Sequence, residues 1–95
     1  MAVEIKNSGF LKDSVKHVVI RTLMSKLEEI NQKLDDINEN MKYFETKYGM
    51  QTEIFYKKFV NGALEDDIDF FEWKASYEIC NELEEEKGML LEAIG

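Results

Sequence analysis

The hydrophobic residues in positions 20–48 follow a regular repeat. Successive apolar positions are separated alternately by three and four residues, and no proline or glycine interrupts the stretch. This spacing is typical of a helix that packs an apolar seam against another helix. The seam consists of Ile20, Leu23, Leu27, Ile30, Leu34, Ile37, Met41 and Phe44, with Tyr48 at its end. It predicts a continuous helix over residues 13–48 and an oligomer interface along that helix.

The repeat leaves three partners open for the seam. The preferred interpretation is self-association, with a dimer as the expected state; the alternatives are another helix of the same chain and a different protein. The flanking charges do not select an orientation, because Lys26, Lys33 and Lys47 would crowd each other in an antiparallel pair and find little complement in a parallel one.

Turn and capping signals divide the rest of the chain into two further helices, at about 52–60 and 67–94. Gly49 supplies the left-handed position that ends many helices. We expect Asp13 or Ser14 to cap the first helix and Thr52 the second. Asn61 and Gly62 end the second helix.

The third predicted helix carries two apolar stripes. Together they are too wide for one seam, so we expect this helix to be covered on more than one side. One stripe is Ile68, Phe71, Ala75, Ile79 and Leu83, and the other is Phe70, Trp73, Tyr77 and Cys80. After Gly88 an apolar tail either extends the helix or awaits a partner.

These elements predict an all-α fold. Ten of the 11 aromatic residues lie between Tyr43 and Tyr77, which predicts an aliphatic stalk joined to an aromatic head. The expected architecture is a long antiparallel helical hairpin with a short connecting helix, whose long helices are about equal in length. Such hairpins would pair into a helical bundle or coiled coil. Residues 1–12 form an N-terminal arm, and residues 13–95 form a single helical domain.

The charge of the chain is acidic and unevenly distributed. The formal net charge is -8, with residues 1–27 at +3 and residues 28–95 at -11. This balance disfavours nucleic acid and favours a basic protein partner. The single Cys80 fits a reducing cytoplasm, and no apolar run is long enough to span a membrane.

The N-terminal arm has two interpretations. Val3 and Ile5 alternate with polar residues before an Asn-Ser-Gly turn, which suits a short strand. In repressors of the ribbon-helix-helix type such a strand pairs across a dimer and contacts DNA. A tail that is frayed or docked on a partner is the favoured alternative, because the following helix shows no break.

An acidic cluster marks the start of the third helix. Asp66, Asp69 and Glu72 share one helix face and could hold Mg²⁺, as in all-α nucleotide pyrophosphohydrolases. That alternative needs a second acidic pair from a facing helix. The favoured interpretation is stabilisation of the helix N-terminus together with solubility. A docking patch for a basic protein partner is a further alternative. The docking residues would be Glu65, Asp66, Asp67, Asp69 and Glu72.

No catalytic residue, cofactor or metal ligand is predicted. His17 is the only histidine and has no second histidine or cysteine near it in sequence, and Cys80 is expected to be a small core residue.

Residues 48–77 resemble small prokaryotic proteins known as antitoxin-like or as uncharacterised neighbours of toxin genes. The matching pieces are Tyr48-Gly49-Met50, Phe55-Tyr56 with Phe59, Gly62, Asp66-Asp67 and Asp69-Phe70-Phe71-Glu72-Trp73. The resemblance implies a small helical protein that neutralises or accompanies a partner, and it carries over no catalytic residue. The N-terminal part matches no DNA-binding domain of antitoxins.

The sequence thus predicts a non-enzymatic protein–protein interaction module in the cytoplasm. It would self-associate through the heptad helix and present an antitoxin-like acidic surface to a basic protein such as a toxin. The alternative is a Mg-dependent all-α nucleotide pyrophosphohydrolase that uses acidic helix faces.

Overall fold

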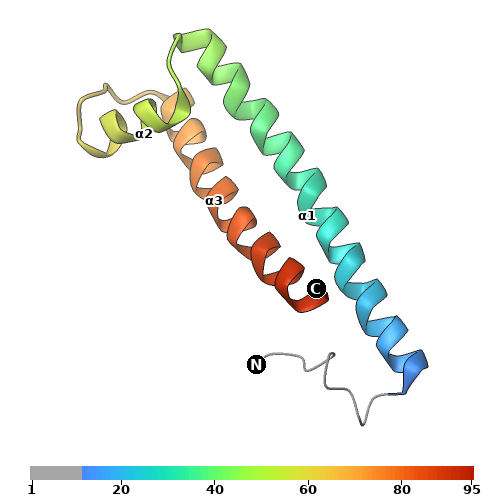
Figure 1. The fold of residues 1–95 in the computed structure, drawn as a ribbon. Coiled ribbons are helices and arrows are strands. Elements are labelled where there is room, and N and C mark those ends of the chain that lie inside the picture. Colours follow the sequence, from blue (N-terminus) through green and yellow to red (C-terminus); the bar gives the residue numbers. More distant parts are fainter. Residues whose placement is uncertain (1–11) are drawn as a thin grey trace.

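The computed structural model describes residues 12–95 and contains three helices in that range. They are α1 (Asp13–Tyr48), α2 (Thr52–Val60) and α3 (Ile68–Ile94). α1 and α3 run antiparallel side by side, and α2 lies across the end where the chain turns (Figure 1). The predicted all-α helical hairpin is confirmed. The predictions for the N-terminal arm fall on residues 1–11, outside the described residues.

Glycine ends α1, as predicted. Gly49 has φ 63°, and its backbone N–H donates to the Glu45 carbonyl oxygen. The Met50 N–H donates to the same oxygen at 3.3 Å. The left-handed residue turns the chain away from the α1 axis, and Met50 packs against the aromatic head. α2 can therefore begin almost at once.

The predicted caps of α1 and α2 were wrong. The N-cap of α1 is Lys12 and that of α2 is Gln51, and neither side chain makes a capping hydrogen bond. Asp13 lies one residue further on, in the first turn, where its charge complements the helix dipole. Thr52 is likewise inside its helix, and its hydroxyl is used in a buried contact instead.

The core lies in the aromatic head, where all three helices meet. Phe44, Phe55 and Trp73 are buried, one from each helix. The Phe55 and Trp73 rings stack with centroids 3.9 Å apart and an interplanar angle of 5°. Residues packed around them are Met41, Tyr48, Met50, Tyr56, Phe59, Leu64 and Phe70. The aromatic head predicted from composition is therefore the tertiary core.

The two long helices differ in length, contrary to expectation. α1 has 36 residues and α3 has 27. Asn40 lies opposite Ser76, with a 2.8 Å hydrogen bond from Nδ2 to Oγ. Continuing this antiparallel register to Ile94 places the end of α3 level with Thr22. Residues 13–22 of α1 therefore extend beyond α3 by about 15 Å at 1.5 Å per residue. Figure 1 shows the start of α1 projecting past the end of α3.

Candidate protein-docking surfaces

The heptad seam packs mainly against α3 of the same chain. Ile30, Leu34 and Phe44 are buried within the single chain. The remaining predicted interface residues, Ile20, Leu23, Leu27, Ile37 and Met41, are half-buried. The central part of the seam therefore packs against another helix of the same chain, which was one of the alternatives left open by the sequence. A single chain does not test whether these residues also contact a second copy, and that prediction stays a prediction.

The two apolar stripes of α3 have different environments. The inner stripe, Phe70, Trp73, Tyr77 and Cys80, is buried or half-buried towards α1 and α2. The outer stripe, defined here as Ile68, Phe71, Ala75 and Ile79, is exposed. Its exposed fractions are 82% for Ile68, 53% for Phe71 and 43% for Ile79. We expected cover on more than one side of α3, but within residues 12–95 the outer stripe is left exposed.

The predicted acidic docking residues separate into two groups. Glu65, Asp66 and Glu72 are exposed, and Glu72 lies beside the outer stripe. Asp67 is the N-cap of α3, and its Oδ1 accepts a 2.8 Å hydrogen bond from the Asp69 backbone N–H. The loop and first turn of α3 are thereby held in place, and the exposed carboxylates are presented to solvent.

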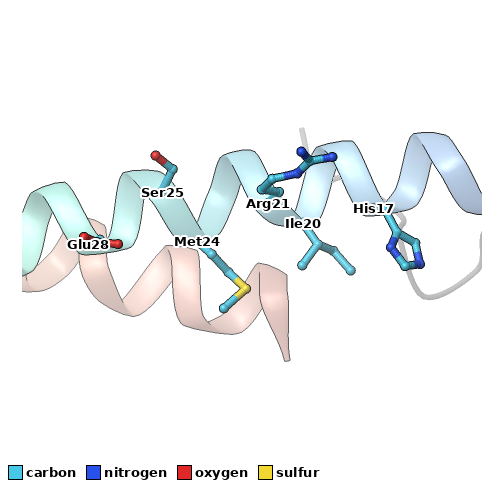
Figure 2. Close-up of a pocket in the computed structure, with 6 residues that line it drawn as sticks. All are labelled: His17, Ile20, Arg21, Met24, Ser25 and Glu28. Carbon is cyan, nitrogen blue, oxygen red and sulfur yellow. The ribbon is translucent and has the colours of Figure 1, made fainter.

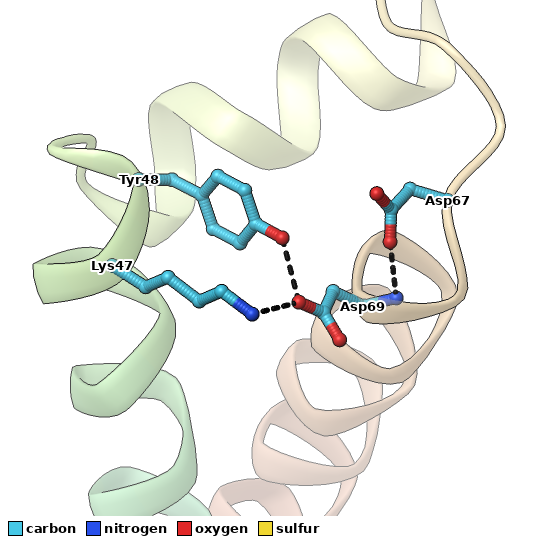
Figure 3. A network of polar contacts seen from close by, with 4 residues as sticks. All are labelled: Lys47, Tyr48, Asp67 and Asp69. Carbon is cyan, nitrogen blue, oxygen red and sulfur yellow. Dashed lines mark hydrogen bonds and ion pairs between the residues drawn. The ribbon is translucent and has the colours of Figure 1, made fainter.

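The Asp69 side chain contacts α1 and does not belong to the open acidic surface. Figure 3 shows its carboxylate turned towards α1, between Lys47 and Tyr48. The Lys47 Nζ atom lies 2.7 Å and the Tyr48 hydroxyl 2.6 Å from Asp69 Oδ2, and both donate to it. The hydrogen bond from Lys47, followed by that from Tyr48, lowers the pKa of the Asp69 carboxyl. Asp69 therefore joins α3 to the end of α1.

A network of buried hydrogen bonds joins all three helices. The Trp73 Nε1–H donates to Thr52 Oγ1 at 3.0 Å, and Thr52 Oγ1 donates to Glu45 Oε2 at 2.9 Å. The Thr52 backbone N–H donates to the same carboxylate oxygen at 2.9 Å. These hydrogen bonds could not be predicted from the sequence, because no local pattern connects residues so far apart. The network lies inside the head, so it fixes how the three helices are oriented relative to one another there.

Glu78 of α3 makes a hydrogen bond with α2 and an ion pair within α3. The Tyr56 hydroxyl donates to Glu78 Oε2 at 2.7 Å, and Lys74 Nζ donates to Glu78 Oε1 at 3.2 Å. The Tyr56 hydrogen bond, with the weaker effect of Lys74, lowers the pKa of Glu78. Glu78 thus ties α2 to α3.

A shallow groove runs along the exposed part of α1. Figure 2 shows its lining residues along the helix, near the end of α3. They are His17, Ile20, Arg21, Met24, Ser25 and Glu28. We call this surface the N-terminal groove. Val15 and Val18 nearby are also exposed. An apolar helical segment that continues beyond the end of its partner helix is a candidate docking surface.

Between residues 12 and 95, no arrangement of side chains supports the Mg²⁺ site considered from the sequence. Within this range, no group of three or more His, Cys, Asp or Glu side chains is placed to hold a metal ion. Cys80 is half-buried, and burial raises the pKa of its thiol. The hydrolase alternative therefore gains no supporting observation. None of the described helices combines the length and the apolar character that crossing a bilayer requires.

Comparisons with family models, curated proteins and solved structures found no match for this chain. The resemblance to antitoxin-like proteins consequently stays a prediction.

Proposed function

We propose that this chain is a non-enzymatic protein–protein interaction module that self-associates and binds a basic partner surface through α3. The observation that carries the proposal is the exposed outer stripe. Its residues recur at helical spacing, so they form one continuous ridge of the kind that packs against another helix.

The fold supports this use of α3 because the inner stripe already supplies the contacts that hold the hairpin together. Phe70 and Trp73 pack in the aromatic head, whereas Phe71 is exposed at the margin of the head, with its ring centroid 5.5 Å from that of Phe59. An apolar ridge that intrachain packing does not need is a typical feature of an interaction site.

The charges around the outer stripe favour a basic partner. α3 carries eight acidic and two basic residues, and Glu65 and Asp66 precede it. Such a surface attracts cationic partners and disfavours acidic ones. The antitoxin-like resemblance would make that partner a basic protein such as a toxin, and this identification belongs to the proposal.

The test is the solution mass of the full chain by light scattering at micromolar concentrations. We expect twice the mass of one chain. Phe71→Ser should reduce the mass towards that of the monomer, because it removes the largest side chain of the outer stripe. Met89→Ser is the matched control, since Met89 is an exposed apolar residue of α3 outside the stripe. A monomeric wild type throughout this range would contradict self-association.

A further inference from the structure

We propose that the partner bound by the outer stripe is a basic amphipathic helix of another protein. This helix would lie along α3, with its apolar side on the stripe and its lysine or arginine side chains among the acidic residues around it. The inference rests on the proposed function and names the kind of partner that the same site takes.

The spacing of the stripe favours a helix as the partner. Its four residues are separated by three or four positions and extend from Ile68 to Ile79, which is eleven residue steps, or about 17 Å. The inner stripe of α3 has the same kind of spacing, and it packs towards the helices α1 and α2. Because a ridge of this kind fits between the side-chain rows of another helix, the outer stripe is suited to a helix in the same way.

The charge around the stripe is almost entirely negative. Residues 65–86 include ten acidic residues and one basic residue, Lys74. The Lys74 Nζ atom lies 3.2 Å from Glu78 Oε1, so its charge is already paired within α3. An apolar ridge in such surroundings attracts a cationic partner, and the charges at its margin select that partner over an acidic one.

Exposed carboxylates stand at both ends of the stripe and beside it. Glu65 and Asp66 precede the stripe, Glu72 lies beside it, and Glu82 follows it by one turn of the helix. We call these four residues the acidic frame. An apolar centre within a polar, solvent-accessible rim is the usual anatomy of a protein–protein interface.

These features define the partner by its chemistry. Its apolar residues recur at spacings of three and four over about three helical turns, and lysine or arginine flanks them. Such a helix covers Ile68, Phe71 and Ile79, whose exposed fractions in the single chain are 82%, 53% and 43%. Its basic side chains can reach the acidic frame at the same time.

A second copy of this chain is the weaker occupant of the stripe. Its own outer stripe has the same acidic frame, so two stripes in contact would bring like charges together. The N-terminal groove is lined by one basic and one acidic residue, Arg21 and Glu28, together with His17, so it offers no strongly basic surface. We therefore expect the basic helix to displace any copy of the chain that covers the stripe.

The test measures binding of synthetic peptides to the full chain. Each peptide has about 18 residues, because shorter isolated helices are marginal in water. The first places leucine at alternating spacings of three and four and lysine elsewhere. The second has the same composition, with leucine spread evenly around the helix, and the third replaces every lysine of the first by glutamate. Isothermal titration calorimetry at an ionic strength of about 0.15 M screens weak surface attraction.

We expect the first peptide to bind at least about tenfold more tightly than the other two, because it alone combines an apolar face with a basic margin. Phe71→Ser removes the largest side chain of the stripe, and Glu72→Gln/Glu82→Gln neutralises half of the acidic frame. Each variant should weaken binding of the first peptide by about tenfold.

Matched controls change the same kinds of side chain on α1. Tyr43→Ser removes an aromatic residue that is 58% exposed, close to the value for Phe71. Glu28→Gln/Glu39→Gln neutralises two exposed carboxylates. Both controls should bind the first peptide within about threefold of wild type. Circular dichroism of every variant checks that the helices are retained.

The outcomes separate the inference from the proposed function. If the first two peptides bind equally and Glu72→Gln/Glu82→Gln weakens both, the site takes any basic surface; the inference is then wrong and the proposed function stands. If Phe71→Ser binds the first peptide like wild type, charge holds the peptide elsewhere and the inference is wrong.

Absence of peptide binding overturns the inference, and the solution mass then decides the rest. A wild-type dimer that Phe71→Ser dissociates would make a second copy the occupant of the stripe and leave self-association intact. A monomeric wild type that binds no peptide would contradict the inference and the proposed function together.

Discussion

Thr52 shows how one side chain can organise the head of the molecule. It is buried, it accepts a hydrogen bond from Trp73, and its hydroxyl and backbone N–H both donate to Glu45. The sequence suggested a helix cap for this residue, which is the usual role of threonine at a helix start. The observed role depends on a tryptophan 21 residues away, and only the folded chain places the two together.

Replacing Thr52 by valine tests this role. The change keeps the shape of the side chain but leaves the buried Trp73 Nε1–H without its acceptor. We expect the free energy of unfolding to fall by about 1–3 kcal/mol, as measured by urea denaturation. Thr46→Val is the control, because Thr46 is exposed on α1. Equal effects of the two substitutions would contradict the proposed role of the hydrogen bond.

Asp69 makes the stability of the hairpin depend on pH. Its carboxyl has an ordinary pKa of 3.8, which its hydrogen bonds from Lys47 and then Tyr48 lower in the folded chain. Its contribution is therefore complete above the ordinary pKa and is lost as the pH falls through the lower folded value. The free energy of unfolding should decline in acid, and Asp69→Asn should make the decline shallower while destabilising the protein at neutral pH.

Denaturation curves from pH 7 down to about pH 2 measure this effect. Asp66→Asn removes a neighbouring exposed carboxyl and serves as the control. An unchanged acid slope in the Asp69 variant would show that the contact to α1 does not couple folding to protonation.

At the scale of the elements, the ends of the helices were predictable because their signals are local. The helix bounds expected from sequence differ from the observed ones by at most one residue. The heptad period, together with Gly49 after α1 and Gly62 after α2, indicated where these helices end. The assignment of faces was less predictable, since both stripes of α3 are apolar at helical spacing and only one of them is buried or half-buried against α1 and α2.

Gly49, which follows α1, and Gly88, which lies within α3, should respond in opposite directions to replacement by alanine. Gly88 lies inside α3, and a Cβ atom there would have nothing within 4 Å. Gly88→Ala should therefore stabilise the protein by about 1 kcal/mol, because alanine has the higher helix propensity. Gly49 has φ 63°, so Gly49→Ala should cost about 1 kcal/mol. Urea denaturation checks both, and effects of the same sign would contradict the assigned conformations.

At the scale of the whole molecule, the unequal helices leave one segment of α1 beyond the end of α3, with no other described helix beside it. Residues 13–22 extend past the end of α3, whereas the central seam residues Ile30 and Leu34 are buried. Unequal protection within one helix is the expected result, because local opening is easier where few apolar contacts hold the backbone.

Amide hydrogen exchange measures that difference. At low protein concentration, residues 13–22 should exchange faster than residues 30–44. Equal protection of the two segments at low concentration would contradict the inferred exposure of the segment beyond α3.

By itself, the sequence determined the helical class, the helix bounds and the aromatic head. Periodicity, glycine positions and composition act over a few residues, so they can be interpreted without knowing the contacts. Tertiary structure decided the partner of the seam, the bridge through Thr52, the inward position of Asp69 and the exposure of the outer stripe. These features depend on the register between α1 and α3, which results from packing across the entire hairpin, and no short stretch of the chain encodes it.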